Sequence, residues 1–176
     1  MMRFVLIFAI TSLASFPVCA QDMPLAQILI DGEQWTKVES PTRGDTRAVV
    51  TSSPDGTTTF RWLPSSGRFI EARQNAAPET QPFVAYCPLR VKPGAQSITV
   101  TSLAADRNGR IYAATEIGVQ VFDPTGRMCG VLTPAAPGKP EQLTFEGDKL
   151  TLWIGDTKYA RKLRTQGAPI KSSPRR

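Results

Sequence analysis

The sequence predicts an all-β protein of short antiparallel strands, and three observations support this. Turn-forming clusters recur roughly every 8–12 residues, the spacing of strand-and-turn folds. The segments between them are rich in β-branched and aromatic residues, as in 57–63 (TTTFRWL) and 119–122 (VQVF). No segment longer than a turn or two has the 3.6-residue apolar period of an amphipathic helix.

A weak internal repeat favours a β-propeller within the all-β class. Residues 54–56 (PDG), a strand and 66–68 (SGR) parallel residues 107–109 (RNG), two strands and 125–127 (TGR). A propeller blade is a four-stranded meander that cannot bury both faces alone, so blades repeat around an axis.

The turn signals also place the individual elements. Pro and Gly punctuate the chain because Pro fixes φ and Gly accepts positive φ. We expect about one helical turn near 25–29, an extended stretch through 35–38, and extended or strand segments over 48–51, 57–63, 68–72, 83–91, 98–104, 110–115, 119–122, 127–132, 142–146, 150–154 and 158–163.

The N-terminus has the features of a secretory signal peptide. Arg3 gives a positive start, residues 4–10 are an apolar run, and residues 18–20 (VCA) end in small side chains. The run is far shorter than the ~20 residues of a membrane span, and no later segment is long enough either. We therefore expect a secreted or periplasmic protein, divided into a signal peptide (1–20), one domain (21–165) and a disordered basic tail (166–176).

Composition excludes several classes of site. The chain has no histidine, which rules out Ser-His-Asp and Cys-His catalysis and histidine-ligated zinc. Its net charge is +6, with much of the excess near the C-terminus, where Tyr159 is the one aromatic residue, so we expect no nucleic-acid partner. In an oxidising compartment Cys87 and Cys129 could form a disulfide or remain two small buried residues, and the sequence leaves both readings open.

Residues 103–132 (LAADRNGRIYAATEIGVQVFDPTGRMCGVL) resemble the late blades of the gluconolactonase/regucalcin family. The shared pattern is an apolar strand, Asp-x-x-Gly, an Ile-Tyr strand, Gly-Val-x-Val-Phe-Asp and x-x-Gly-Arg. Residues 140–163 continue the pattern, and residues 24–38 resemble the mature N-terminus of its secreted members. Because that family has six blades, the resemblance implies an incomplete propeller of about three four-stranded antiparallel blades.

The resemblance also implies where a metal would bind. In that family a Glu, an Asn and an Asp hold a divalent cation that polarises a lactone carbonyl. Counting from Trp35 places Thr46 at the Glu position, with Asp45 beside it, and Thr101 stands at the Asp position. Asp106 follows as a second weak candidate, and the middle blade that would supply the Asn is missing.

Asp106 also begins a segment that resembles the start of a calcium loop. Its twelfth position is Ile117, where such a loop needs a carboxylate, so a hairpin turn is the favoured interpretation. We therefore expect no catalytic residue, no metal ligand and no cofactor. Ca²⁺, Mg²⁺ or Zn²⁺ would be needed only if the chain is a lactonase.

Three functional hypotheses follow. The first is a catalytically inactive gluconolactonase-like protein that serves as a binding or remnant module. The second is a metal-dependent sugar-lactone hydrolase, completed by self-association through exposed blade edges. The third is a carbohydrate-binding module that uses Trp62 or Trp153, although core packing is the favoured role for these side chains. The expected ligand is a small sugar acid or a glycan, and the sequence leaves open whether the chain is an enzyme.

Overall fold

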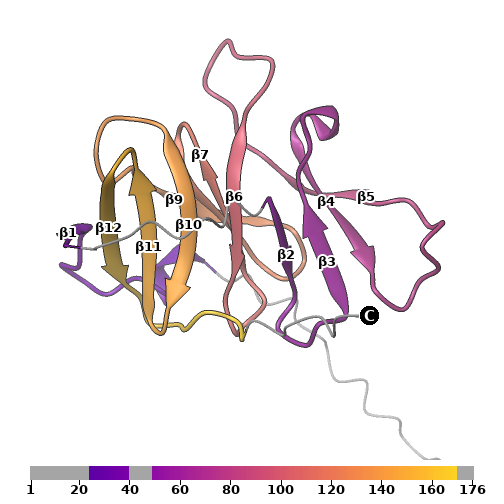
Figure 1. The fold of residues 1–176 in the computed structure, drawn as a ribbon, viewed down its shortest axis with the longest axis horizontal. Coiled ribbons are helices and arrows are strands. Elements are labelled where there is room, and N and C mark those ends of the chain that lie inside the picture. The colour runs from indigo at the N-terminus through magenta and orange to yellow at the C-terminus, as the bar shows by residue number, and fades with distance from the viewer. Residues whose placement is uncertain (1–23, 40–48, 170–176) are drawn as a thin grey trace, which may run out of the picture.

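The computed structural model of the chain describes residues 24–39 and 49–169. Strands in this part form three four-stranded antiparallel sheets (Figure 1). Sheet A has the order β1-β12-β11-β10, sheet B the order β2-β3-β4-β5, and sheet C the order β6-β7-β8-β9. The predicted all-β class with three four-stranded blades is thereby confirmed.

The elements follow the predicted turn signals closely. Two short 3₁₀ turns, η1 (Leu25–Gln27) and η2 (Pro64–Ser66), accompany the strands β1 (Thr36–Val38), β2 (Val50–Ser52), β3 (Thr58–Arg61), β4 (Phe69–Gln74), β5 (Val84–Pro88), β6 (Val100–Ala105), β7 (Ile111–Thr115), β8 (Gly118–Phe122), β9 (Met128–Leu132), β10 (Pro140–Glu146), β11 (Lys149–Ile154) and β12 (Thr157–Lys162).

Two turns of sheet C show why Asp-x-x-Gly makes a hairpin. In the β6–β7 turn, Asp106 Oδ1 accepts hydrogen bonds from the backbone N–H groups of Asn108 and Arg110, both at 2.9 Å. In the β8–β9 turn, Asp123 makes the corresponding pair of bonds two and four residues on. The Gly of each turn has a positive φ, +83° and +84°, which other residues rarely adopt. The repeat seen in the sequence is therefore a repeated turn structure.

Strand β1 joins sheet A rather than the sheet that follows it in the chain. Thr36, Lys37 and Val38 pair antiparallel with Ala160, Tyr159 and Lys158 of β12. The last sheet is thus built from both ends of the described chain, a long-range pairing that local sequence patterns do not reveal.

The core consists of two apolar clusters, one on each side of sheet C. Phe60 and Ile70 of sheet B pack with Ile111 and Phe122 of sheet C in the first cluster. The second cluster joins the opposite face of sheet C to sheet A and contains Tyr112, Val121, Leu143, Leu150 and Leu152. Each sheet therefore stabilises the next by burying an apolar face, as in packed β-layers.

The strands β2, β6 and β10, one from each sheet, lie next to one another and place the three sheets in an arc. Strand β6 contacts both β2 and β10, and the Ser102 hydroxyl donates a buried hydrogen bond to the Leu143 carbonyl at 3.2 Å. In Figure 1, sheets A and B extend to opposite sides of β6. Within the two described ranges, the helical segments are too short to cross a membrane.

Two predicted segments fall partly or wholly outside the described residues. The signal peptide over 1–20 lies outside them, as do residues 170–176 of the predicted tail. The start of that tail is placed against sheet C: Gln166 accepts a hydrogen bond from the Arg107 N–H, and the Ala168 N–H donates to Ala105. Backbone pairing thus extends a few residues beyond the predicted domain end at 165.

Candidate ligand site at the inner strands

Thr101 lies at a bulge in the inner strand β6, where the pairing with β7 shifts register between Val100 and Ser102. Its side chain is half-buried, and its hydroxyl donates to the Ala114 carbonyl of the neighbouring strand at 3.3 Å. This hydroxyl is therefore used within its own sheet. A threonine hydroxyl also carries no charge, so it is a weak substitute for a carboxylate ligand of a dication.

Asp106 is fully buried, and both of its oxygens accept hydrogen bonds. Oδ1 accepts the two backbone N–H groups of the hairpin turn. Oδ2 accepts the Tyr112 hydroxyl at 2.9 Å and faces the Arg110 guanidinium at 3.5 Å. Four donors thus surround the carboxylate, which is the environment of a buried structural anion.

The partners of Asp106 are as buried as the carboxylate itself. Arg110 is 2% exposed, and its second terminal nitrogen donates to Gln27 Oε1 at 3.0 Å. Burial and then the negative charge of Asp106 raise the pKa of Tyr112, so its hydroxyl remains a donor. Asn108 reaches Thr165 near the C-terminal end of the domain. This network fastens η1 and the C-terminal segment to the β6–β7 hairpin.

The candidate metal ligands are not brought together. Thr101 and Asp106 stand at opposite ends of β6, about 16 Å apart at ~3.3 Å per residue, too far to share one ion. Asp45 and Thr46 lie outside the described residues. No group of three or more His, Cys, Asp or Glu side chains suited to a metal occurs in the part of the chain that the structure describes. Asp106, surrounded by donors, does not fit the role of a metal ligand.

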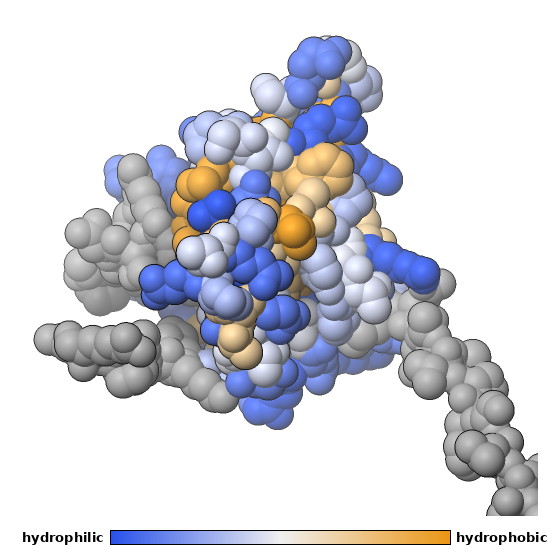
Figure 2. All heavy atoms as spheres, turned by 90° about the vertical axis from the view of Figure 1, so that its right-hand side faces the viewer, coloured by the Kyte–Doolittle hydropathy of each residue, from blue (hydrophilic) through white to orange (hydrophobic). Residues whose placement is uncertain are grey.

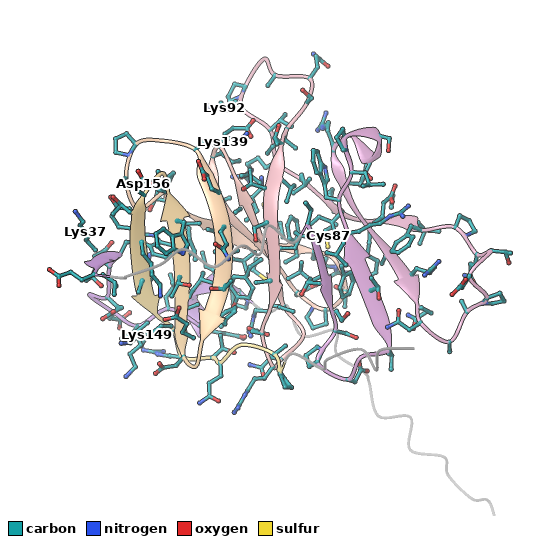
Figure 3. The ribbon with its side chains drawn as sticks, viewed as in Figure 1. Lys37, Cys87, Lys92, Lys139, Lys149 and Asp156 are labelled. Atoms are coloured by element: carbon teal, nitrogen blue, oxygen red, sulfur yellow. The ribbon has the colours of Figure 1, made fainter. Side chains whose placement is uncertain are left out.

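The two cysteines lie on opposite sides of sheet C. Cys87 packs in the cluster between sheets B and C (Figure 3). Cys129 packs against the cluster between sheets C and A. Both thiols are free, and the intervening sheet separates them. Burial raises the pKa of Cys87 and raises that of Cys129 to about 11, so both remain protonated thiols near neutral pH. The structure therefore has no disulfide between them.

The tryptophans predicted as alternative sugar-stacking groups have structural roles. Trp62 and Trp153 are each 7% exposed, and Trp62 Nε1 donates to the Gly67 carbonyl at 3.2 Å. Trp35 is half-buried and donates to the Thr133 carbonyl at 2.9 Å. The favoured prediction of core packing agrees with this burial, and an exposed aromatic platform at Trp62 or Trp153 does not.

Sheet B presents a feature that the sequence reasoning missed. Its outer face, the side turned away from sheet C, carries Arg61 and Glu71, which form an ion pair at 3.0 Å, and Arg73. The guanidinium carbons of Arg61 and Arg73 lie 3.7 and 4.7 Å from the centroid of the Phe83 ring. The alternation of Phe69, Glu71 and Arg73 with the buried Ile70 and Ala72 could have indicated this face.

Comparisons with known proteins give similarity in structure alone. No model of a known protein family matches the chain, and no curated protein matches it. A solved gluconolactonase from Xanthomonas campestris is 21% identical with a TM-score of 0.53, covering 65% of this chain and 36% of its own. A putative gluconolactonase is 18% identical with a TM-score of 0.54, covering 68% and 39%.

A regucalcin from Agrobacterium tumefaciens, described as a calcium-binding protein, is 18% identical with a TM-score of 0.49, over 68% of this chain and 45% of its own. The chain thus spans less than half the length of each of these proteins. At these identities the likeness concerns the fold. The resemblance expected from residues 103–132 is confirmed at that level: the described chain has part of the gluconolactonase β-propeller fold.

Proposed function

We propose that the chain is a secreted or periplasmic gluconolactonase-like protein that binds a ligand without hydrolysing it. The proposal rests chiefly on one observation, the four donors that occupy the Asp106 carboxylate. The gluconolactonase-like fold and the signal-peptide pattern of residues 1–20 support the lineage and the compartment. By analogy with that lineage, the ligand class is a small sugar acid.

Lactone hydrolysis needs an activated nucleophile and a group that stabilises the developing oxyanion. Binding Asp106 to a cation would require its release from Arg110 and Tyr112, leaving a buried guanidinium without its anion. The cysteines offer no thiolate near neutral pH, because burial raises the pKa of both thiols. Histidine is absent from the whole chain. These observations favour binding over catalysis.

Metal binding and lactone hydrolysis together test this proposal. We expect calorimetry of the mature chain with Ca²⁺, Mg²⁺ and Zn²⁺, each added alone, to show no stoichiometric site. Glucono-1,5-lactone should hydrolyse at the buffer rate at every protein concentration, which also tests a hydrolase completed by self-association. Gluconate should raise the melting temperature of the protein if a sugar acid is the ligand.

Two matched variants make the assay specific. Asp106→Asn removes the buried carboxylate that was the candidate metal ligand. Asp156→Asn is the control and removes an exposed turn carboxylate of sheet A (Figure 3). Tight metal binding together with hydrolysis that Asp106→Asn abolishes and Asp156→Asn preserves would overturn the proposal. Absence of both activities in the wild type and in the two variants would support it.

A further inference from the structure

The large apolar side chains that are exposed in the described part of the chain gather on one blade. Val50, Leu63, Phe69 and Val84 are 52%, 41%, 42% and 56% exposed, and all four belong to sheet B or its β3–β4 connection. Figure 2 views the molecule from the side on which sheet B lies and shows orange apolar residues there among blue polar ones. Exposed apolar groups that cluster in this way mark interaction surfaces.

The pairing register separates these side chains: Val84 lies opposite the buried Ala72 at the edge of the sheet, whereas Val50 lies on the outer face. Val50, Arg61, Glu71 and Ala85 lie side by side across all four strands on the side opposite the buried Phe60 and Ile70. Phe69 lies on the same outer side, two residues before Glu71. Sheet C has a neighbouring sheet on each face, whereas no described sheet packs on this face of sheet B, which the Phe83 ring covers in part by stacking on Arg61 and Arg73.

The two ends of the arc differ in this respect. On the corresponding outer side of sheet A, Thr151 and Trp153 are 1% and 7% exposed. Among the described residues, exposed large apolar side chains therefore lie at the sheet B end of the arc and not at the sheet A end. A partner that repeats the sheet-on-sheet packing of the core would cover the outer face of sheet B with another sheet, at the ~10 Å spacing of packed β-layers.

We propose that this partner is a second copy of the chain, placed face to face through sheet B about a two-fold axis. A two-fold interface must be self-complementary, because the same patch is used by both copies. The outer face satisfies this requirement: it carries the Glu71 carboxylate, the guanidinium groups of Arg61 and Arg73, and apolar side chains at Val50 and Phe69. Glu71 of one copy can then face an arginine of the other, while the apolar residues lose contact with water.

This dimer would form whether or not the chain hydrolyses lactones, so it stands apart from the function proposed above. It continues the packing already present between sheets B and C. It also covers apolar side chains of sheet B that are otherwise exposed to water.

Light scattering coupled to size exclusion tests the dimer, with the mature chain studied from about 1 to 100 μM, the range of weak-to-moderate association. We expect twice the monomer mass at the upper concentrations. Phe69→Lys should weaken association at least ~10-fold, because it places a charge in the apolar part of the interface. Gln96→Lys adds the same charge on the exposed loop that carries Lys92 (Figure 3) and should leave the dimer intact.

A charge exchange distinguishes self-pairing through sheet B from other modes of association. Glu71→Arg should dissociate the dimer by placing like charges on facing copies, as should the double variant Arg61→Glu with Arg73→Glu. Mixing these two proteins should restore a dimer that contains one copy of each. Circular dichroism and melting curves verify that every variant is folded.

Three results would overturn the inference. The first is a monomer at all concentrations. The second is a dimer that Phe69→Lys leaves unchanged, because its interface would then lie elsewhere. The third is an open-ended series of larger species, which a closed two-fold interface does not permit.

Discussion

Sheets B and C are built from similar hairpins but differ in burial. Every residue of β7 and β8, the central strands of sheet C, is buried, whereas the central strands of sheet B, β3 and β4, are buried only at Phe60, Ile70 and Ala72. Sheet C lies between two neighbours, and sheet B packs against one. Strands at the same position in their sheets thus differ in burial because of what packs on the sheet. The number of neighbouring layers, more than the strand itself, decides how much of a strand is buried.

Removing a large side chain from sheet C should have the greatest effect. Phe122 is fully buried between sheets B and C, so Phe122→Ala should lower the free energy of unfolding by about 3–5 kcal/mol through lost burial and a residual cavity. Phe69→Ala, on the outer face of sheet B, should change it by less than ~0.5 kcal/mol in dilute protein. Urea denaturation measures both, and equal losses would contradict the difference between the sheets.

The next effect should appear at the buried turn of sheet C. Asp106→Asn keeps an oxygen for the turn N–H groups but removes the charge that faces Arg110, and should lower the free energy of unfolding by about 1.5–3 kcal/mol. Asp123→Asn, in the equivalent turn, is the matched control and should be milder. A larger loss for Asp123→Asn would show that the turn bonds, rather than the Arg110–Tyr112 network, dominate.

The smallest expected difference between the two sides of sheet C is in the reactivity of the thiols of Cys87 and Cys129. Both should react slowly with iodoacetamide at pH 8 in the folded protein, and Cys87, which is fully buried, should be the slower. Mass spectrometry of the labelled peptides measures the two rates. An unlabelled disulfide between the two cysteines under non-reducing conditions would contradict their separation by sheet C.

The raised pKa of Cys129 also predicts a pH dependence of stability. Its folded-state pKa of about 11 exceeds its ordinary value of 9.0, so the folded state holds the proton more tightly. The contribution is fully present below pH 9 and is lost as the pH rises from 9 to 11. Cys129→Ala should remove this part of the alkaline loss, and unchanged alkaline sensitivity would argue that Cys129 does not contribute.

Local chemistry made most of the strands predictable. Proline, glycine and aspartate at the turns fixed where hairpins begin, and β-branched and aromatic runs between them marked the strands. The Asp-x-x-Gly repeat at Asp106 and Asp123 even indicated two equivalent turns. The part that could not be predicted depends on long-range pairing, as in the placement of Thr36–Val38 beside β12.

The candidate site was predictable only in part, for the same reason. That Thr101 stands in place of a carboxylate is implied by the family resemblance and stays a prediction, whereas the sequence correctly indicated Asp106 as a turn residue. The contacts of Asp106 Oδ2 with the Tyr112 hydroxyl and the Arg110 guanidinium, however, exist only once the β6–β7 hairpin has formed. The exposure of Phe69 likewise depends on which sheet lies next to it, which no local pattern states.

Hydrogen exchange followed by mass spectrometry tests the central contrast most directly. Peptides of β7 and β8 in sheet C should exchange slowly at every protein concentration, because both faces of their sheet are covered. Peptides of β2, β4 and β5 should exchange faster in dilute protein and become slower as the concentration rises and the outer face of sheet B is covered. Equal protection of sheets B and C in dilute protein, with no dependence on concentration, would contradict the account.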